Sequence, residues 1–168
     1  NVKSWNEESR NKCIEIGYTK VYKSWTDKLK KDALHHRSND KWYPDFQGKA
    51  PFSLIFLPST VKNIFNDDEL ENWLMEIILS VSEQFPNNPI IIKPHPLQKM
   101  QTVKRVLSML SDIKCIISFV HPGLLAAQAQ FVISHHSTTI IDAMALNVPV
   151  IHHQFFTDHW LQRHPSGP

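Results

Sequence analysis

Short, continuous apolar runs alternate with longer amphipathic segments along most of this chain, and this alternation restricts the fold more than any other feature. The runs lie at residues 52–57, 90–93, 114–119, 131–134 and 148–152, and the helical segments between them at 67–85, 98–110, 122–130 and 137–146. Strands alternating with helices at this spacing indicate βαβ units. Continuous apolar runs are typical of strands covered on both faces. The sequence predicts an α/β fold, a Rossmann-like parallel sheet of about five strands with flanking helices.

The first part of the chain has a different pattern. Residues 1–47 are polar, rich in Trp and Tyr, and loosely helical in periodicity, with one expected apolar face formed by Ile14, Tyr18, Val21, Tyr22 and Trp25. Residues 35–40 are predicted to form a loop, and residues 48–51 to mark a boundary. We therefore expect a helical linker or the end of a preceding domain at 1–47, and the Rossmann-like domain at 48–168. Because the sequence starts without Met, we expect it to be part of a longer protein.

Charge and cysteine content exclude several classes of function. The formal net charge is +2, from 18 basic and 16 acidic residues, which argues against duplex nucleic acid as a partner. The local basic excess at residues 20–31 and Arg37 indicates a solvated helix face, with a peripheral membrane or partner contact as the alternative. Cys13 lies in a helical amphipathic region and Cys115 far away in an apolar run, so the two cysteines do not suggest a disulfide framework. We therefore expect a reducing, cytoplasmic compartment or the inner face of the membrane.

Two polar corners follow predicted strands. The strand at 90–93 ends in Lys93-Pro94-His95-Pro96, and the strand at 131–134 leads into Ser137-Thr138-Thr139 at a helix start. Open parallel sheets bind ligands at the carboxyl ends of their strands. A His held between prolines and a cluster of hydroxyls both suit a phosphate group. The plain alternatives are a structural turn at His95 and simple capping of the helix by Ser137.

Other polar residues admit weaker interpretations. His121-Pro122-Gly123 follows the strand at 114–119, where a loop contacts a nucleotide base or merely turns into a helix. Asp142 is a candidate ribose contact or an ordinary acid near a helix start, and Asp67-Asp68-Glu69 is predicted to cap the helix at 67–85. Adjacent His pairs such as His35-His36 cannot easily chelate one ion, so no metal site is predicted. With only four glycines, the chain lacks Gly-x-Gly-x-x-Gly and Walker A cradles.

Taken in order, the corners resemble the carboxyl-terminal half of a GT-B glycosyltransferase of the capsule polysaccharide biosynthesis type, with Kdo transferases and sialyltransferases as relatives. The resemblance covers residues 52–160 and rests on the His-Pro corner, on Ser137-Thr138-Thr139, and on residues 142–151, Asp-Ala-Met-Ala-Leu-Asn-Val-Pro-Val-Ile. It implies that His95, Ser137 and Thr138 hold the phosphate of a nucleotide-sugar, with Thr139 as a weaker candidate. Two interpretations of Lys93 stay open: its charge adds to the field at the phosphate, or its side chain points outward and contributes nothing.

This resemblance implies a donor-binding domain at 48–168 of a glycosyltransferase for surface or capsular polysaccharide. Its substrates would be a nucleotide-sugar, with a CMP-linked sugar as one option, and a glycan or glycolipid acceptor, with no other cofactor. Two departures stand out: Ile140 replaces a common Gly, and the acidic general-base motif of the sialyltransferases is absent. The catalytic residues are therefore not identified. A nucleotide-sugar 2-epimerase-like enzyme and a non-catalytic Rossmann-like interaction module are the alternatives.

Overall fold

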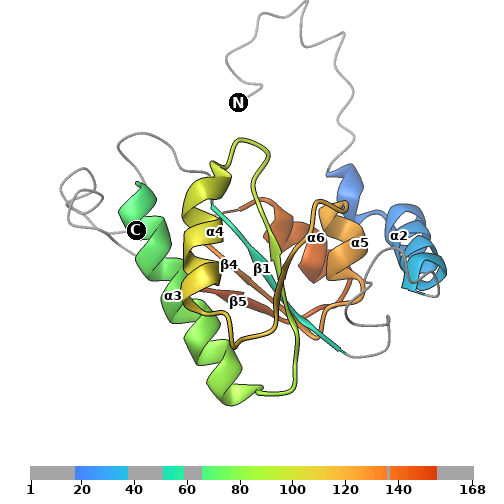
Figure 1. The fold of residues 1–168 in the computed structure, drawn as a ribbon. Helices are drawn as coiled ribbons and strands as arrows, with labels where there is room; N and C mark the ends of the chain where they lie inside the picture. Colours follow the sequence, from blue (N-terminus) through green and yellow to red (C-terminus); the bar gives the residue numbers. More distant parts are fainter. Residues whose placement is uncertain (1–17, 38–50, 59–65, 136, 155–168) are drawn as a thin grey trace, which may run out of the picture.

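A parallel five-stranded sheet forms the centre of the molecule (Figure 1). The computed structural model describes residues 18–37, 51–58, 66–135 and 137–154. The strands are β1 (Ser53–Phe56), β2 (Ile90–Lys93), β3 (Cys115–Ile117), β4 (Phe131–Ser134) and β5 (Val150–His152). Their spatial order is β3-β2-β1-β4-β5, and every neighbouring pair is parallel. The predicted α/β fold is confirmed.

Helices cover both faces of the sheet, which explains the continuous apolar runs. On one face α3 (Asp67–Gln84) and α4 (Met100–Met109) pack over alternate strand residues such as Ile55 and Ile92. On the other face α2 (Lys23–Arg37), α5 (Pro122–Ala126) and α6 (Thr139–Ala145) lie over the remaining ones, such as Leu54 and Ile91 (Figure 1). All residues of β1 and β4 are buried, whereas the two edge strands are partly open to solvent.

The helix α3 begins at Asp67, as predicted, but its capping residue differs from the prediction. Asn66, rather than the acidic run that follows it, is the N-cap. The Asn66 side chain accepts a hydrogen bond from the Glu69 main-chain N–H at 2.9 Å, and the Glu69 carboxylate accepts one from the Asn66 N–H at 2.7 Å. This reciprocal pair is a capping box. The acids Asp67, Asp68 and Glu69 occupy the first turn, where the helix dipole stabilises their negative charges.

Trp73 anchors α3 in the core. It is completely buried, and its indole N–H donates to Nδ1 of His153 at 3.0 Å. A buried indole needs such an acceptor to offset the loss of water. The bond joins the middle of α3 to the residue that follows β5.

The amino-terminal described segment corrects two predictions. A 3₁₀ turn, η2 (Thr19–Val21), precedes α2, and extended backbone at Tyr22 separates them, so no single helix carries the expected apolar face. Tyr18, Val21 and Tyr22 are exposed, and α2 instead turns Leu29 and Ala33 inward. The predicted loop at 35–40 is wrong at 35–37, because α2 continues to Arg37. Ile14 and the boundary at 47–48 lie outside the described residues, so that boundary stays a prediction.

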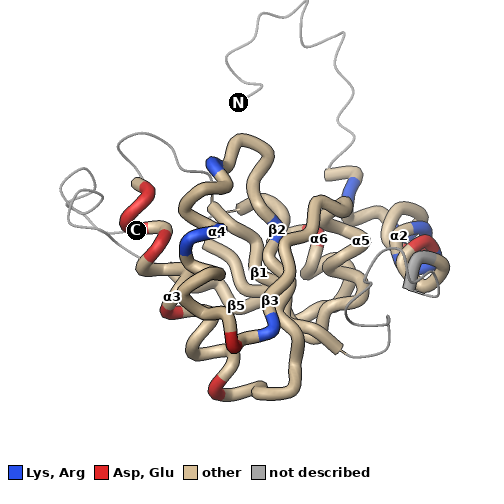
Figure 2. Tube along the Cα trace, viewed as in Figure 1, with Lys and Arg blue, Asp and Glu red and all other residues tan. Residues whose placement is uncertain are grey.

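Helix α2 carries charged residues of both signs (Figure 2). Lys23 pairs with Asp27 at 2.5 Å and Lys28 with Asp32 at 2.6 Å, each one helical turn apart. Such exposed pairs are each worth only a few tenths of a kcal/mol, roughly 0.3–0.5. Among the described helices, none combines the length and the hydrophobicity that crossing a membrane requires.

Candidate functional site

The order of the strands defines one special position at the carboxyl edge of the sheet. From β1 the chain moves outward to β2 and β3, and then returns to the other side of β1 to form β4 and β5. The connections therefore leave β1 and β4 in opposite directions. In open α/β sheets the crevice at such a switch point is the usual ligand site.

A cleft of about 240 Å³ lies at this switch point. We call it the switch-point cleft. Its lining comes from the ends of β1 and β2, from the start of α5 and from the segment after β4: Phe56, Leu57, Lys93, Pro94, His95, Pro96, Pro122, Ser137, Thr138 and Thr139. The two polar corners singled out from the sequence therefore meet in one cleft. Among the residues that the structure describes, no Asp or Glu belongs to this lining.

His95 is oriented by its own turn. Its Nδ1 accepts a hydrogen bond from the Leu97 N–H at 3.2 Å, and its carbonyl accepts one from the Gln98 N–H at 2.9 Å. Since Nδ1 is an acceptor, the neutral ring carries its proton on Nε2. His95 thus keeps a second ring nitrogen as a donor, which suits an anionic or hydroxyl ligand.

Lys93 supplies the positive charge of the cleft. Its side chain is half-buried, with Nζ 6.0 Å from the centre of the Phe119 ring and 3.4 Å from the Pro94 carbonyl oxygen. Burial lowers the pKa of Lys93 below its usual 10.5. None of the ion pairs among the described residues involves Lys93.

Hydroxyl groups occupy the opposite side of the cleft. Ser137 Oγ lies 2.7 Å from Thr139 Oγ1 and accepts the Thr139 N–H at 3.3 Å. The N-cap of α6 is Thr138, whose side chain makes no capping bond, so Ser137 is not the N-cap that the plain alternative expected. Ser137 and Thr139 share one hydroxyl–hydroxyl contact, and Thr138 is exposed beside them.

Of the remaining candidates, Pro122 lines the cleft, whereas His121, Gly123 and Asp142 have contacts outside its lining. His121 is the N-cap of α5, and its Nδ1 accepts the Gly123 N–H at 3.1 Å. Gly123 is buried so tightly that an added Cβ would lie 2.9 Å from Cδ1 of Leu29. Only Pro122 of this corner lines the cleft. Burial lowers the pKa of His121, Asp142 opposes that shift, and Lys20 and Lys93 add to it.

Asp142 also lies away from the lining of the cleft. Its carboxylate is 4% exposed, and Oδ2 accepts a hydrogen bond from Nζ of Lys20 at 3.1 Å. Its other oxygen, Oδ1, is buried without a partner. Lys20 was not a candidate residue, because the pair is separated by 122 positions and no local pattern connects them.

Phe119, which lies under the Lys93 ammonium group, was missed because a single exposed aromatic residue carries no sequence signal.

Metal chemistry finds no support in the part of the chain that the structure describes. Within residues 18–37, 51–58, 66–135 and 137–154, no three His, Cys, Asp or Glu side chains are grouped to hold an ion.

Cys115 is partly buried, and burial raises the pKa of its thiol to about 12. A thiol of that pKa is a poor nucleophile at neutral pH.

Comparisons with known proteins leave the family open. No family model matches the chain, and no curated protein matches it in sequence. Among solved structures, one described as the crystal structure of the GtfA/B complex is 16% identical, with a TM-score of 0.43, over 67% of this chain and 22% of that chain. The chain thus spans less than a quarter of this neighbour's length. The fold assignment rests on the sheet order itself.

Proposed function

We propose that the switch-point cleft binds the phosphate groups of a nucleotide-sugar, and that the chain is the donor-binding domain of a glycosyltransferase for surface or capsular polysaccharide. One observation carries the proposal: the Lys93–Pro96 corner and the Ser137–Thr139 corner, about forty residues apart in sequence, line the same cleft. The order of these motifs and their resemblance to GT-B enzymes supports the polysaccharide assignment.

The chemistry of the lining favours a phosphate. Transfer of a sugar leaves negative charge on the departing phosphate oxygens, and donors fixed in advance stabilise that charge. Lys93 offers an ammonium group that forms no ion pair with any described carboxylate, His95 offers a ring N–H, and Ser137 and its neighbours offer hydroxyls. The acceptor site and any general base would lie elsewhere.

Nucleotide binding tests the proposal directly. We would titrate CMP, CDP, UDP, GDP and ADP into the chain and follow the melting temperature. A ligand that binds only the folded state raises the free energy of unfolding, by about 2.7 kcal/mol at one hundred times Kd, and so raises the melting temperature. His95→Ala and Ser137→Ala should weaken the binding of the active nucleotide about tenfold. Matched controls are His35→Ala on α2 and Ser80→Ala on α3, both exposed and outside the cleft.

The pattern of nucleotides then narrows the function. CMP binding would favour a Kdo or sialic acid donor, and UDP binding a hexose donor or the 2-epimerase alternative, which product analysis separates. If His95→Ala and Ser137→Ala both bound the nucleotide with wild-type affinity, the switch-point cleft would not be the nucleotide site.

One observation favours a non-catalytic interaction module instead. His95 Nδ1 and Ser137 Oγ already accept main-chain N–H groups, as residues that only shape turns would. Under this alternative no nucleotide shifts the melting temperature, although the alanine variants still loosen their turns.

A further inference from the structure

One large apolar side chain lies beside the switch-point cleft without belonging to its lining. Phe119 is two residues past the end of β3, at the carboxyl edge of the sheet, and is 71% exposed. The centre of its ring is 6.0 Å from Nζ of Lys93, which lines the cleft. The ring therefore borders the cationic side of the cleft, although the proposed phosphate contacts make no use of it.

The residues on both sides of Phe119 are fixed by the fold. Ser118 is buried, and its N–H donates to the Ile92 carbonyl oxygen at 2.9 Å, next to the paired residues of β2 and β3. Val120 packs against the core beneath α5, and its N–H donates to Ser118 Oγ at 3.4 Å. Because its neighbours are held in this way, the exposed ring needs little ordering of the backbone when a ligand stacks on it.

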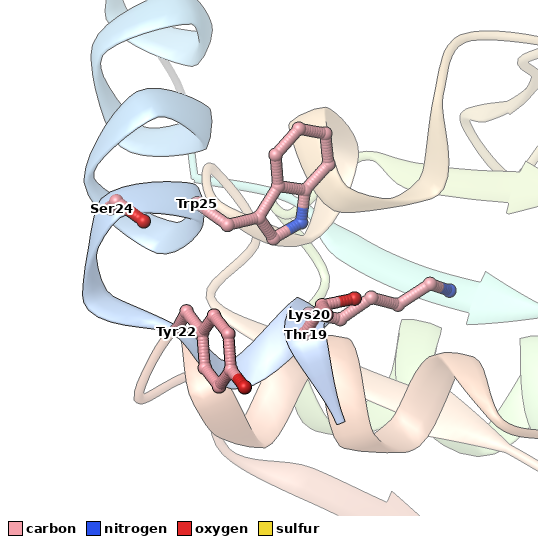
Figure 3. A pocket seen from close by; sticks show the side chains of 5 residues that line it. All are labelled: Thr19, Lys20, Tyr22, Ser24 and Trp25. Atoms are coloured by element: carbon pink, nitrogen blue, oxygen red, sulfur yellow. The ribbon is translucent and has the colours of Figure 1, made fainter. Parts of the chain in front are cut away.

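The fold itself uses the other candidates for a base contact in this segment. His121 caps α5, and in Figure 3 the Trp25 ring extends from α2 toward the rest of the domain. The centres of the Trp25 and His121 rings are 6.4 Å apart, with planes at 81°. Gly123 is packed so closely that an added Cβ would meet Leu29. Phe119, by contrast, belongs to neither core cluster of the described residues.

The size of the cleft implies that a bound nucleotide extends beyond its lining. The volume of about 240 Å³ is below the roughly 300–1,000 Å³ of sites that enclose a drug-sized ligand. A cleft of this size holds phosphate groups but not the whole nucleoside attached to them. On the Lys93 side the neighbouring surface is the Phe119 ring, and nucleobases stack on exposed aromatic rings.

We propose that Phe119 stacks on the base of the nucleotide whose phosphates the switch-point cleft holds, an inference that rests on the nucleotide site proposed above. Lys93 then lies between the two parts of the ligand, since it lines the cleft and its ammonium group is over the ring. Stacking uses the flat face that every base has, so Phe119 adds affinity for nucleotides in general and does not choose among the bases.

Calorimetry and NMR on the whole chain test the proposal, with the nucleotide from the panel above that raises the melting temperature most. Phe119→Ala should weaken its binding about tenfold, whereas Phe119→Trp should keep it. In the wild type the ring current of Phe119 should move the base proton signals upfield on binding, and this shift should vanish in Phe119→Ala. Met109→Ala is the matched control, since Met109 is also exposed, at 56%, and lies outside the cleft lining.

The outcomes separate this inference from the nucleotide site itself. Equal nucleotide affinity in Phe119→Ala and the wild type, together with a loss in His95→Ala, would overturn the stacking and leave the site in place. A loss in Phe119→Ala that Phe119→Trp does not restore, or that comes without the upfield shift in the wild type, would also overturn it. Binding of no nucleotide to the wild type would overturn both.

Discussion

Two polar corners at the same edge of the sheet have opposite surroundings. The Lys93–Pro96 corner after β2 lines the switch-point cleft, whereas the corner after β3 reaches the cleft only through Pro122, and its His121 and Gly123 contact α2. Their sequences are alike, each a His next to Pro just past an apolar strand. The difference comes from what packs on them: Trp25 and Leu29 of α2 contact the second corner and nothing comparable from α2 lines the cleft.

The same contrast holds for the polar side chains near α6. Ser137 and Thr139 line the cleft, while Asp142, three residues after Thr139, is paired with Lys20. A strand-end corner is thus available to a ligand only where no other part of the chain occupies it. Among the described residues, the amino-terminal segment contacts Gly123 and Asp142 and does not line the switch-point cleft.

Removing the helix contact that covers the second corner should have the largest effect. Leu29→Ala deletes a side chain that is 5% exposed and packs against Gly123, and truncations of buried leucine cost about 2–5 kcal/mol. Urea unfolding would measure the loss. The control Leu34→Ala, exposed on the same helix, should change stability by less than about 0.5 kcal/mol. An equally small effect of Leu29→Ala would mean that α2 adds little to the domain and acts as a linker.

Most of the sheet could be predicted because each strand corresponds to a short apolar run in the local sequence. The runs at 90–93 and 131–134 match β2 and β4 in full, since a strand buried on both faces has few polar residues to interrupt it. The meeting of His95 with Ser137 then follows from strand order, because β2 and β4 both pair with β1. Local sequence thus leads to the cleft once the sheet is parallel.

The covering segment could not be predicted in the same way. Helical spacing suggested one apolar face through Tyr22, but the backbone is extended there, and the inward residues of α2 begin three positions later at Trp25. The pairing of Lys20 with Asp142 joins distant positions and depends on how α2 docks. Long-range docking of a polar segment leaves no periodic signal in a single sequence.

Breaking the ion pair between Lys20 and Asp142 should have an intermediate effect on stability. Lys20→Met leaves the Asp142 carboxylate buried with neither oxygen paired, which should cost about 1–3 kcal/mol near neutral pH. The pKa of Lys20 is raised in the folded state, so its stabilisation is complete below the unfolded value of 10.5 and is lost as pH rises through the folded value. Urea unfolding of both proteins should show their difference shrinking above pH 10.5. A difference that is constant across this range would show that Lys20 contributes by packing rather than by charge. The control Lys28→Met removes an exposed lysine of α2 and should change little at any pH.

The smallest change in stability should come from the open corner, and with the opposite sign. Burial lowers the pKa of Lys93, so its charge destabilises the folded state below that pKa, and the penalty is relieved as pH rises toward 10.5. Lys93→Met should therefore leave the melting temperature equal or slightly higher at neutral pH, while it weakens nucleotide binding and flattens the dependence of that binding on salt. Calorimetry at two ionic strengths would measure both effects, with Lys104→Met on α4 as the exposed control. A clear loss of stability in Lys93→Met would mean that the contact of Lys93 with Phe119 stabilises the folded state. The corner after β2 would then be structural, like His121 and Gly123 after β3.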